Sequence, residues 1–346
     1  MFTPDYRNIV DAASNIQAKR LPLYEHFICS DIMEQYLNKK FCNLRMGDFS
    51  TKKEYFRHFC DFYKQNGYDT VSFEICIMSY LINGGALSKH VDGAIKNRDD
   101  FNKYPWDEIP EKFYADSREQ FLALQEVMPD GMKAIGGIGN GVFECVQDLT
   151  GYENLCMIKY DDPELYEDLF NKVGDMSATI WYRFLNEFSD LFCVLRFGDD
   201  LGYKSNTLLD PNDIRQFVIP QYKKVINLVH NKGKKFLLHS CGCIFNVMDD
   251  LIAAGIDAKH SNEDVIAEFP VWVEKYGDKI GNFGGIDTDA VCSMDKASMK
   301  EYIIEVIEKC SGHGGFAFGS GNSIPNYVKI ENFLIMVEIV REYRKE

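Results

Sequence analysis

The stretch FLLHSCG, residues 236–242, is a short apolar run that ends in a histidine, a cysteine and a glycine. Side chains alternate along a strand with a period of two, so His239 and Cys241 are expected on the same face. Imidazole and thiolate are ligands that suit zinc, and Gly242 lets the chain turn sharply after them. The stretch therefore predicts a buried strand that ends in a catalytic zinc site. A buried histidine beside a buried cysteine, without metal, is the alternative that these residues leave open.

Other short apolar runs alternate with longer stretches of helical periodicity along the whole chain. The eight expected strands are Leu21–His26, Thr70–Ile77, Lys133–Ile138, Leu191–Phe197, Lys235–His239, Ala258–Ser261, Ile280–Gly285 and Gly315–Gly319. Strands that alternate with helices pair in parallel, and eight of them fit a closed (β/α)8 TIM barrel. An open, doubly wound sheet is the alternative, but no Gly-x-Gly-x-x-Gly follows the first strand.

Helix boundaries are marked by proline, by capping residues and by glycine. Proline after an aspartate opens helices at Pro163 and Pro211, whereas Gly233 and Gly255 are expected to end helices, the second of which runs over Phe245–Ala254. The last helix is expected over residues 330–343. These apolar stripes are interpreted as core.

The 346 residues are interpreted as a single barrel domain, 1–346, with two additions. Residues 1–20 are expected to form a helical extension that closes the bottom of the barrel. Residues 78–131 form a connection much longer than a usual strand-to-helix loop, and it is expected to lie over the mouth and set selectivity. A purely stabilising insertion is the alternative.

Charge and composition exclude several classes of function. The net charge of −15, without a long basic run, argues against nucleic-acid binding. No apolar run approaches the roughly 20 residues of a membrane span, and no basic segment followed by an apolar one opens the chain. The 11 cysteines are odd in number and scattered, which does not fit a disulfide framework. We therefore expect a reduced cytoplasmic enzyme without a membrane or nucleic-acid partner, whose oligomeric state stays open.

The ends of the expected strands are unusually polar. Because active sites of these barrels form at the carboxyl ends of the strands, the polar side chains are expected to converge on one metal or acid–base site. Glu74 lies within an apolar strand, where a carboxylate needs a metal, an arginine or a raised pKa. Asp199 and Asp200 are adjacent, so only one of them is expected to point into the mouth.

Four segments of the chain resemble the uroporphyrinogen decarboxylase superfamily. They are HSCG (239–242), DDLIAAGIDA (249–258), GGIDT (284–288) and FGSGNSIP (318–325). The resemblance runs from about Arg7 to the end of the chain, and it implies a (β/α)8 barrel.

The superfamily has two functional branches, which the first strand helps to distinguish. Decarboxylases carry an arginine-rich segment after that strand to hold substrate carboxylates, whereas this chain has LPLYEHF at 21–27. The other branch, the cobalamin-dependent methyltransferases of the methylcobamide:coenzyme M type, binds zinc through a His-x-Cys pair and a cysteine after the last strand. His239 and Cys241 match the pair, but Ser320 stands in place of the last cysteine.

The resemblance thus predicts a zinc-dependent methyltransferase that moves a methyl group between a small methylated substrate and the cobalamin of a separate corrinoid protein. A methyl ether or similar donor is favoured over a thiol acceptor. The corrinoid must come from a partner docked at the barrel mouth, because the chain has no Asp-x-His-x-x-Gly signature.

Roles are expected for twelve residues. The expected ligands of Zn(II) are His239, Cys241 and Glu25, with Glu74, an aspartate or Cys310 as alternatives to Glu25. The expected catalytic residues are Glu74, Asp199 and Asn322, and the expected substrate-binding residues are His26, Asn140, Asp200, His260, Asp287 and Ser320. Two other functions stay open: a metal-free decarboxylase that acts on a different acid, and a non-enzymatic barrel that binds or regulates a partner.

Overall fold

A parallel sheet of seven strands curls around the centre of the protein in the computed structural model, which describes residues 2–346. The strands follow one another around the sheet in chain order. They are β1 (Thr70–Cys76), β2 (Lys133–Gly139), β3 (Phe192–Gly198), β4 (Lys235–His239), β5 (Ala258–His260), β6 (Gly281–Ile286) and β7 (Phe316–Ser320). Every neighbouring pair is parallel, so the carboxyl ends of the strands lie together at one end of the barrel, which we call the mouth.

The first expected strand, Leu21–His26, is present only as a bridge. Leu23 forms a parallel bridge with Phe318 of β7, and the N–H of Phe318 donates to the carbonyl of Pro22 over 2.9 Å. Proline has no N–H, which limits how far a ladder can extend from this segment. The prediction of a barrel is confirmed, but seven of the eight expected strands form the sheet.

The gap between this segment and β1 has no backbone ladder among the described residues. The side chain of Ser72 on β1 donates instead to the carbonyl of His26 over 2.5 Å. β1 is therefore an edge strand of the sheet.

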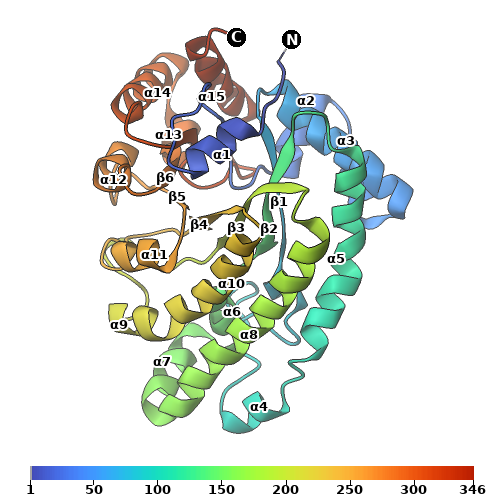
Figure 1. Ribbon diagram of the computed structural model, residues 1–346, viewed down its shortest axis with the longest axis vertical. Coiled ribbons are helices and arrows are strands. Elements are labelled where there is room, and N and C mark those ends of the chain that lie inside the picture. The colour runs from blue at the N-terminus through green and yellow to red at the C-terminus, as the bar shows by residue number, and fades with distance from the viewer. Residues whose placement is uncertain (1) are drawn as a thin grey trace.

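Helices surround the sheet, and most outer helices pack against the next one along the chain (Figure 1). The outer helices are α3 (Phe49–Gln65), α5 (Glu108–Val127), α8 (Pro163–Phe188), α10 (Ile219–Asn231), α11 (Met248–Ala254), α12 (Phe269–Tyr276), α14 (Lys296–Cys310) and α15 (Ile330–Tyr343). Shorter helices are α2 (Ser30–Leu37), α4 (Arg98–Lys103), α6 (Val142–Thr150), α7 (Tyr152–Asp161), α9 (Pro211–Asp213) and α13 (Thr288–Ser293). A π-helical turn, Ile214–Val218, joins α9 to α10.

The expected helix signals are confirmed at most ends. Asp162 caps α8 by accepting from the N–H of Leu165 over 2.9 Å. Gly255 follows α11 in the left-handed conformation, with φ of +109°. The last helix has the predicted bounds, whereas α11 begins at Met248, three residues after the expected Phe245.

Within residues 2–20, the amino-terminal helix α1 (Arg7–Ala13) contacts β3, β4, β6 and β7 at the end of the barrel opposite the mouth. Ile9, Ala12 and Ala13 pack into the barrel interior. The carbonyl of Ala12 lies so close to the strand starts that a Cβ at Gly281 or Gly315 would come within 2.2 or 1.9 Å of it. Glycine at both positions therefore lets the helix seat against the sheet.

The long connection after β1 contains a 3-10 turn (Ile77–Tyr80), α4 and α5. Residues 84–95 lie along α6, where the N–H groups of Leu87 and Ser88 donate to Asp148 and that of Ile95 to the carbonyl of Leu149. The segment packs beside the barrel, and its expected role in selectivity stays a prediction.

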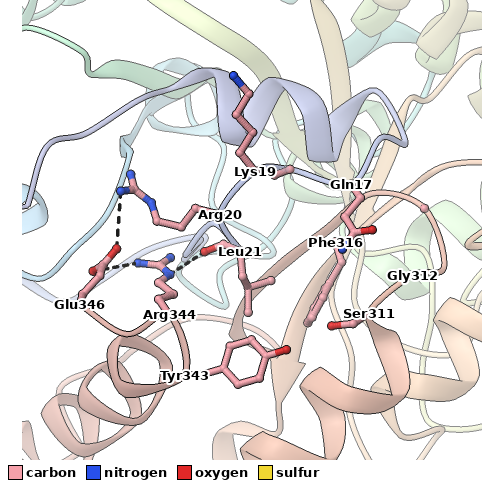
Figure 2. A pocket seen from close by; sticks show the side chains of 12 residues that line it. Gln17, Lys19, Arg20, Leu21, Ser311, Gly312, Phe316, Tyr343, Arg344 and Glu346 are labelled. Atoms are coloured by element: carbon pink, nitrogen blue, oxygen red, sulfur yellow. Dashed lines mark hydrogen bonds and ion pairs between the residues drawn. The ribbon is translucent and has the colours of Figure 1, made fainter.

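A hollow of about 460 Å³ lies beside the start of β7 at the closed end of the barrel (Figure 2). Arg20 and Arg344 face the carboxylate of Glu346 there, at 3.5 and 3.8 Å. Arg344 also donates to the carbonyl of Leu21 over 2.6 Å. These contacts tie the last helix to the first barrel segment, far from the mouth. Among residues 2–346, no helix combines the length and the apolar character that a membrane span needs.

The seating of α1 can be tested with two isoleucines of the same region. Ile9→Ala removes a fully buried side chain, so we expect it to lower the free energy of unfolding by about 2–4 kcal/mol. Ile16→Ala, at a position that is 57% exposed, should change it by less than about 0.5 kcal/mol. Urea denaturation measures the change in the free energy of unfolding for each variant. Equal changes in the two variants would contradict the packing of α1 inside the barrel.

Candidate metal centre

His239 and His260 lie side by side because β4 and β5 pair in a register that opposes them. Their Nδ1 atoms are 2.7 Å apart, and Nε2 of His260 lies 3.0 Å from the carbonyl oxygen of Ser320. A carbonyl only accepts, so Nε2 of His260 carries a proton. Burial lowers the pKa of His260 to about 3, so its Nδ1 is unprotonated and accepts from Nδ1–H of His239. This series of hydrogen bonds leaves an unprotonated lone pair on Nε2 of His239.

The free nitrogen of His239 faces a thiol and a carboxylate. Cys241 Sγ lies 3.4 Å from Nε2, and Asp200 Oδ1 lies 3.7 Å from it. Asp200 is held in place by the backbone N–H of Cys241, which donates to Oδ1 over 2.9 Å. Gly242, with φ of +82°, then turns the chain closely against Gly202. The three ligand atoms lie within 4.8 Å of one another.

The spacing of these three atoms fits a tetrahedral zinc ion. Bonds of about 2.0 Å to nitrogen or oxygen and about 2.3 Å to sulfur place neighbouring ligand atoms about 3.3–3.6 Å apart. The separation of 3.4 Å between Nε2 of His239 and Sγ of Cys241 lies within that range, and the 3.7 Å between Nε2 and Oδ1 of Asp200 is slightly longer. Histidine that ligates through one nitrogen and donates from the other is also the usual arrangement around zinc. Asp200, His239 and Cys241 can therefore hold the metal that the strand-end motif predicts.

The protonation of Cys241 depends on a nearby cation. Burial raises the pKa of its thiol, and the carboxylate of Asp200 raises it further. Without a cation the sulfur keeps its proton, whereas a bound divalent ion favours the thiolate. Asn322 donates to the same sulfur over 3.4 Å, and Ser261 donates over 3.6 Å.

A second group, His26, His239 and His260, brings three imidazoles within the same range. The rings of His26 and His239 are stacked, with centroids 3.9 Å apart and planes inclined by 19°. Lone pairs of stacked rings run parallel and do not converge on one ion. Both nitrogens of His260 are also occupied by hydrogen bonds. The geometry favours the group that contains Asp200 and Cys241.

Glu25, the expected third ligand, lies outside both groups of candidate ligands. It is 1% exposed, and its carboxyl group is bonded to the N–H and the hydroxyl of Ser320. Burial without a cationic partner raises the pKa of Glu25 to about 8, so the group is a neutral acid at pH 7. Asp200, one of the aspartates left open as an alternative to Glu25, lies beside His239 and Cys241 instead. Ser320, expected to bind substrate, is fully buried, and Cys310 lies buried at the end of α14.

Asp199 has a structural set of contacts in place of the expected catalytic one. It is fully buried and accepts from the N–H groups of Phe143 and Glu144 over 2.9 and 2.8 Å, at the start of α6. The hydroxyl of Tyr222 donates to it over 2.6 Å. Its neighbour Asp200 points to the mouth, which agrees with the expectation that only one of the two would do so.

Two other expected substrate-binding residues also hold loops in place. Asp287 accepts from the N–H groups of Asp264 and Asp289, both over 2.7 Å, and it lines a groove at the mouth. Asn140, in the left-handed conformation with φ of +65°, donates to Glu144 over 2.9 Å. The structure does not bring their side chains into the ligand group of Asp200, His239 and Cys241.

Arg196 is a buried charged residue next to the site that the sequence analysis missed. It lies on β3, is 1% exposed, and donates to the carboxylate of Glu74 over 2.7 and 3.1 Å. It also donates to Tyr24 over 2.8 Å and to Ser72 over 2.9 Å. Arg196 thus supplies one of the partners that a carboxylate within an apolar strand was expected to need. A cation within the apolar run of β3 was the signal that could have identified it.

Comparisons with known proteins agree with this architecture. The profile of the family described as Uroporphyrinogen decarboxylase (URO-D) matches residues 89–343. A methyltransferase from Methanosarcina mazei superposes with a TM-score of 0.73 at 15% identity, over 99% of each chain. A B12-independent methionine synthase from Shewanella sp. W3-18-1, in complex with selenomethionine, gives 0.51 at 13% identity over 85% of this chain and 89% of its own. No match was found among curated proteins.

The identity of the third ligand can be tested by measuring zinc affinity. We expect Asp200→Asn and Cys241→Ser each to weaken the binding of zinc at least about tenfold. Each substitution removes a negatively charged group that would bind the metal directly. Glu25→Gln should leave the affinity unchanged, since Glu25 is neutral and bonded to Ser320. Competition with a chromogenic chelator measures all three. Loss of zinc in Glu25→Gln with retention in Asp200→Asn would restore the original expectation.

The raised pKa of Glu25 also predicts that the stability of the protein depends on pH. Its pKa of about 8 in the folded protein lies above its ordinary value of 4.5, so the folded state binds the proton more tightly. The stabilisation is complete below about pH 4.5 and is lost as the pH rises through 8. Relative to Glu25→Gln, the free energy of unfolding of the unaltered protein should therefore fall over that window in urea denaturation. A constant difference would contradict the burial of a neutral acid.

Proposed function

This chain belongs to the uroporphyrinogen decarboxylase family, and we propose that within that family it is a zinc-dependent methyltransferase. It would move a methyl group between a small methylated substrate and the cobalamin of a separate corrinoid protein. The observation that carries the proposal is the grouping of Asp200, His239 and Cys241 at the mouth, with an unprotonated imidazole nitrogen facing a thiol and a carboxylate. The activity named for the Methanosarcina mazei neighbour is in line with it.

The ligands would be His239 Nε2, Cys241 Sγ and one oxygen of Asp200. A zinc ion there supplies a Lewis acid with one position left for substrate. His260 and the Ser320 carbonyl keep His239 in the required tautomer. The side chain of Asp200 is 43% exposed, so the group is open toward the mouth.

Two further side chains are placed to position substrate. The amide of Asn322 donates to Cys241 Sγ over 3.4 Å and lines the groove at the mouth. Its side-chain oxygen accepts from the hydroxyl of Ser323 over 3.4 Å and keeps a second lone pair for a bound molecule. Glu74, fixed by Arg196, lies 3.9 Å from Nε2 of His26 at the inner side of the site. These groups orient a donor without themselves forming a bond to it.

With a methyl ether as donor, the balance of the reaction is simple. The bond between the methyl carbon and oxygen breaks, and its electron pair stays on oxygen. The methyl group is accepted by Co(I) of the corrinoid, whose electron pair forms the new bond. One proton from the medium neutralises the oxygen of the leaving group.

The rim of the mouth suits a protein that delivers the corrinoid. A groove of about 660 Å³ lies beside Asn322. Large apolar side chains are exposed on the loops that follow the strands, namely Phe27, Tyr203, Val265 and Tyr327. Exposed apolar groups around a polar groove are typical of protein-binding surfaces.

A decarboxylase that acts on a polyanionic substrate fits the barrel less well. Such a substrate needs free cationic groups. Arg196, inside the barrel, is already bonded to Glu74, Tyr24 and Ser72. Arg196 is therefore not free to bind such a substrate, and the bonded polar groups inside the barrel favour the methyltransferase over a metal-free decarboxylase.

Methyl transfer to reduced cobalamin tests the proposal. Donors would be methyl ethers, methylated amines and methylated thiols, and the loss of Co(I) absorbance would report transfer. We expect zinc-dependent turnover with one donor class. His239→Ala should lower the rate at least a hundredfold because it removes a metal ligand. That loss corresponds to about 2.7 kcal/mol of transition-state stabilisation.

A matched control is His230→Ala on α10, where the ring pairs with Asp257 away from the mouth; it should keep full activity. Activity that survives both a chelator and His239→Ala would overturn the metal-dependent scheme. Tight zinc without turnover on any donor class would favour a binding or regulatory barrel.

A further inference from the structure

A cavity of about 150 Å³ penetrates the wall of the barrel beside β1. It is lined by Ser72, Phe73 and Glu74, three consecutive residues of that strand. Consecutive side chains point to opposite faces of a sheet, so a cavity that touches all three must lie along the strand edge. That edge is the one left unpaired where the first expected strand is reduced to a bridge. The cavity thus occupies the place of a missing backbone ladder.

The inner end of this cavity borders the candidate metal centre. His26 lines it, and the same ring stacks on His239 with centroids 3.9 Å apart. Nδ1 of His26 and the hydroxyl of Tyr63, which also lines the cavity, are buried without a hydrogen-bond partner. Buried polar atoms are normally satisfied, so two such atoms at one cavity indicate a ligand that supplies partners.

The wall of the cavity is aromatic, and its charge comes from one arginine. Tyr55, Phe59 and Phe73 line it together with Arg45. The guanidinium of Arg45 lies 5.3 Å from the ring centroid of Phe73, and its Nε donates to Gln120 over 2.7 Å. Within residues 2–346 no carboxylate forms an ion pair with Arg45, whereas Arg196 at the inner end is neutralised by Glu74.

We propose that this side cavity binds the body of the methyl donor, and that the donor is a small planar carboxylate or similar anion. The inference rests on the proposed methyl transfer and adds the class of substrate. A cavity near 150 Å³ holds a molecule about the size of one aromatic ring. The ring packs on Tyr55, Phe59 and Phe73, and the acid group binds Arg45. The hydroxyl of Tyr63 and Nδ1 of His26, which have no partner in the protein, are available to a further polar group of the same molecule.

The proposal is tested by binding, which does not require turnover. Calorimetric titration would compare three probes of one shape: benzoate, neutral methoxybenzene and cationic benzylamine. We expect benzoate to bind most tightly. Arg45→Gln should weaken benzoate at least about tenfold, the value of a charge-assisted hydrogen bond, and leave methoxybenzene unchanged.

The matched control is Arg183→Gln, because Arg183 also stacks on a ring, 3.9 Å from that of Tyr114, but lies outside the cavity. It should bind benzoate as the unaltered protein does. Benzoate affinity that is insensitive to Arg45→Gln, or benzylamine that binds as tightly as benzoate, would overturn the proposal.

Titration of Cys241→Ser separates this inference from the metal-dependent function. Unchanged benzoate affinity in that variant supports a pocket that exists without the metal, even if methyl transfer is never observed. Loss of benzoate binding there would mean that the carboxylate binds a metal at the mouth, and it would overturn the assignment to the side cavity.

Discussion

The hydrogen-bonded chain from the Ser320 carbonyl through His260 to His239 is the interaction on which the candidate site depends. A carbonyl cannot donate, so it fixes the proton on Nε2 of His260 and, one step further, the proton on Nδ1 of His239. Only then does His239 present a lone pair to Cys241 and Asp200. The backbone register of β4, β5 and β7 thereby determines the chemistry of one nitrogen atom.

A polar layer inside the barrel separates the mouth from the apolar base. Arg196, Glu74, Tyr24 and Ser72 satisfy one another there, so a charged pair is buried at low cost. Below them, α1 packs against an apolar interior. The polar groups thus lie toward the mouth, where the strand ends carry the reactive side chains in barrels of this type.

The incomplete first strand links the fold to the proposed selectivity. Where a complete ladder would close the wall, Leu23 forms a single bridge, and an aromatic cavity lies beside the free edge of β1. The residues that follow this bridge include His26, which borders both the cavity and His239. A departure from regular barrel geometry would then bring a substrate pocket next to the ligand group.

The amino-acid sequence by itself determined the alternation of strands and helices, most helix ends, the barrel class, the plug at its base and the pairing of His239 with Cys241 on one strand end. These features follow from periodicity and local capping, which act over a few residues. Only the tertiary structure decided that Asp200 and not Glu25 joins them, that Asp199 caps α6, and that Arg196 neutralises Glu74. Each of these depends on which side chains from distant strands meet at the mouth or inside the barrel. Contacts of that kind are set by sheet register and by the desolvation of buried charge, neither of which can be read from neighbouring residues.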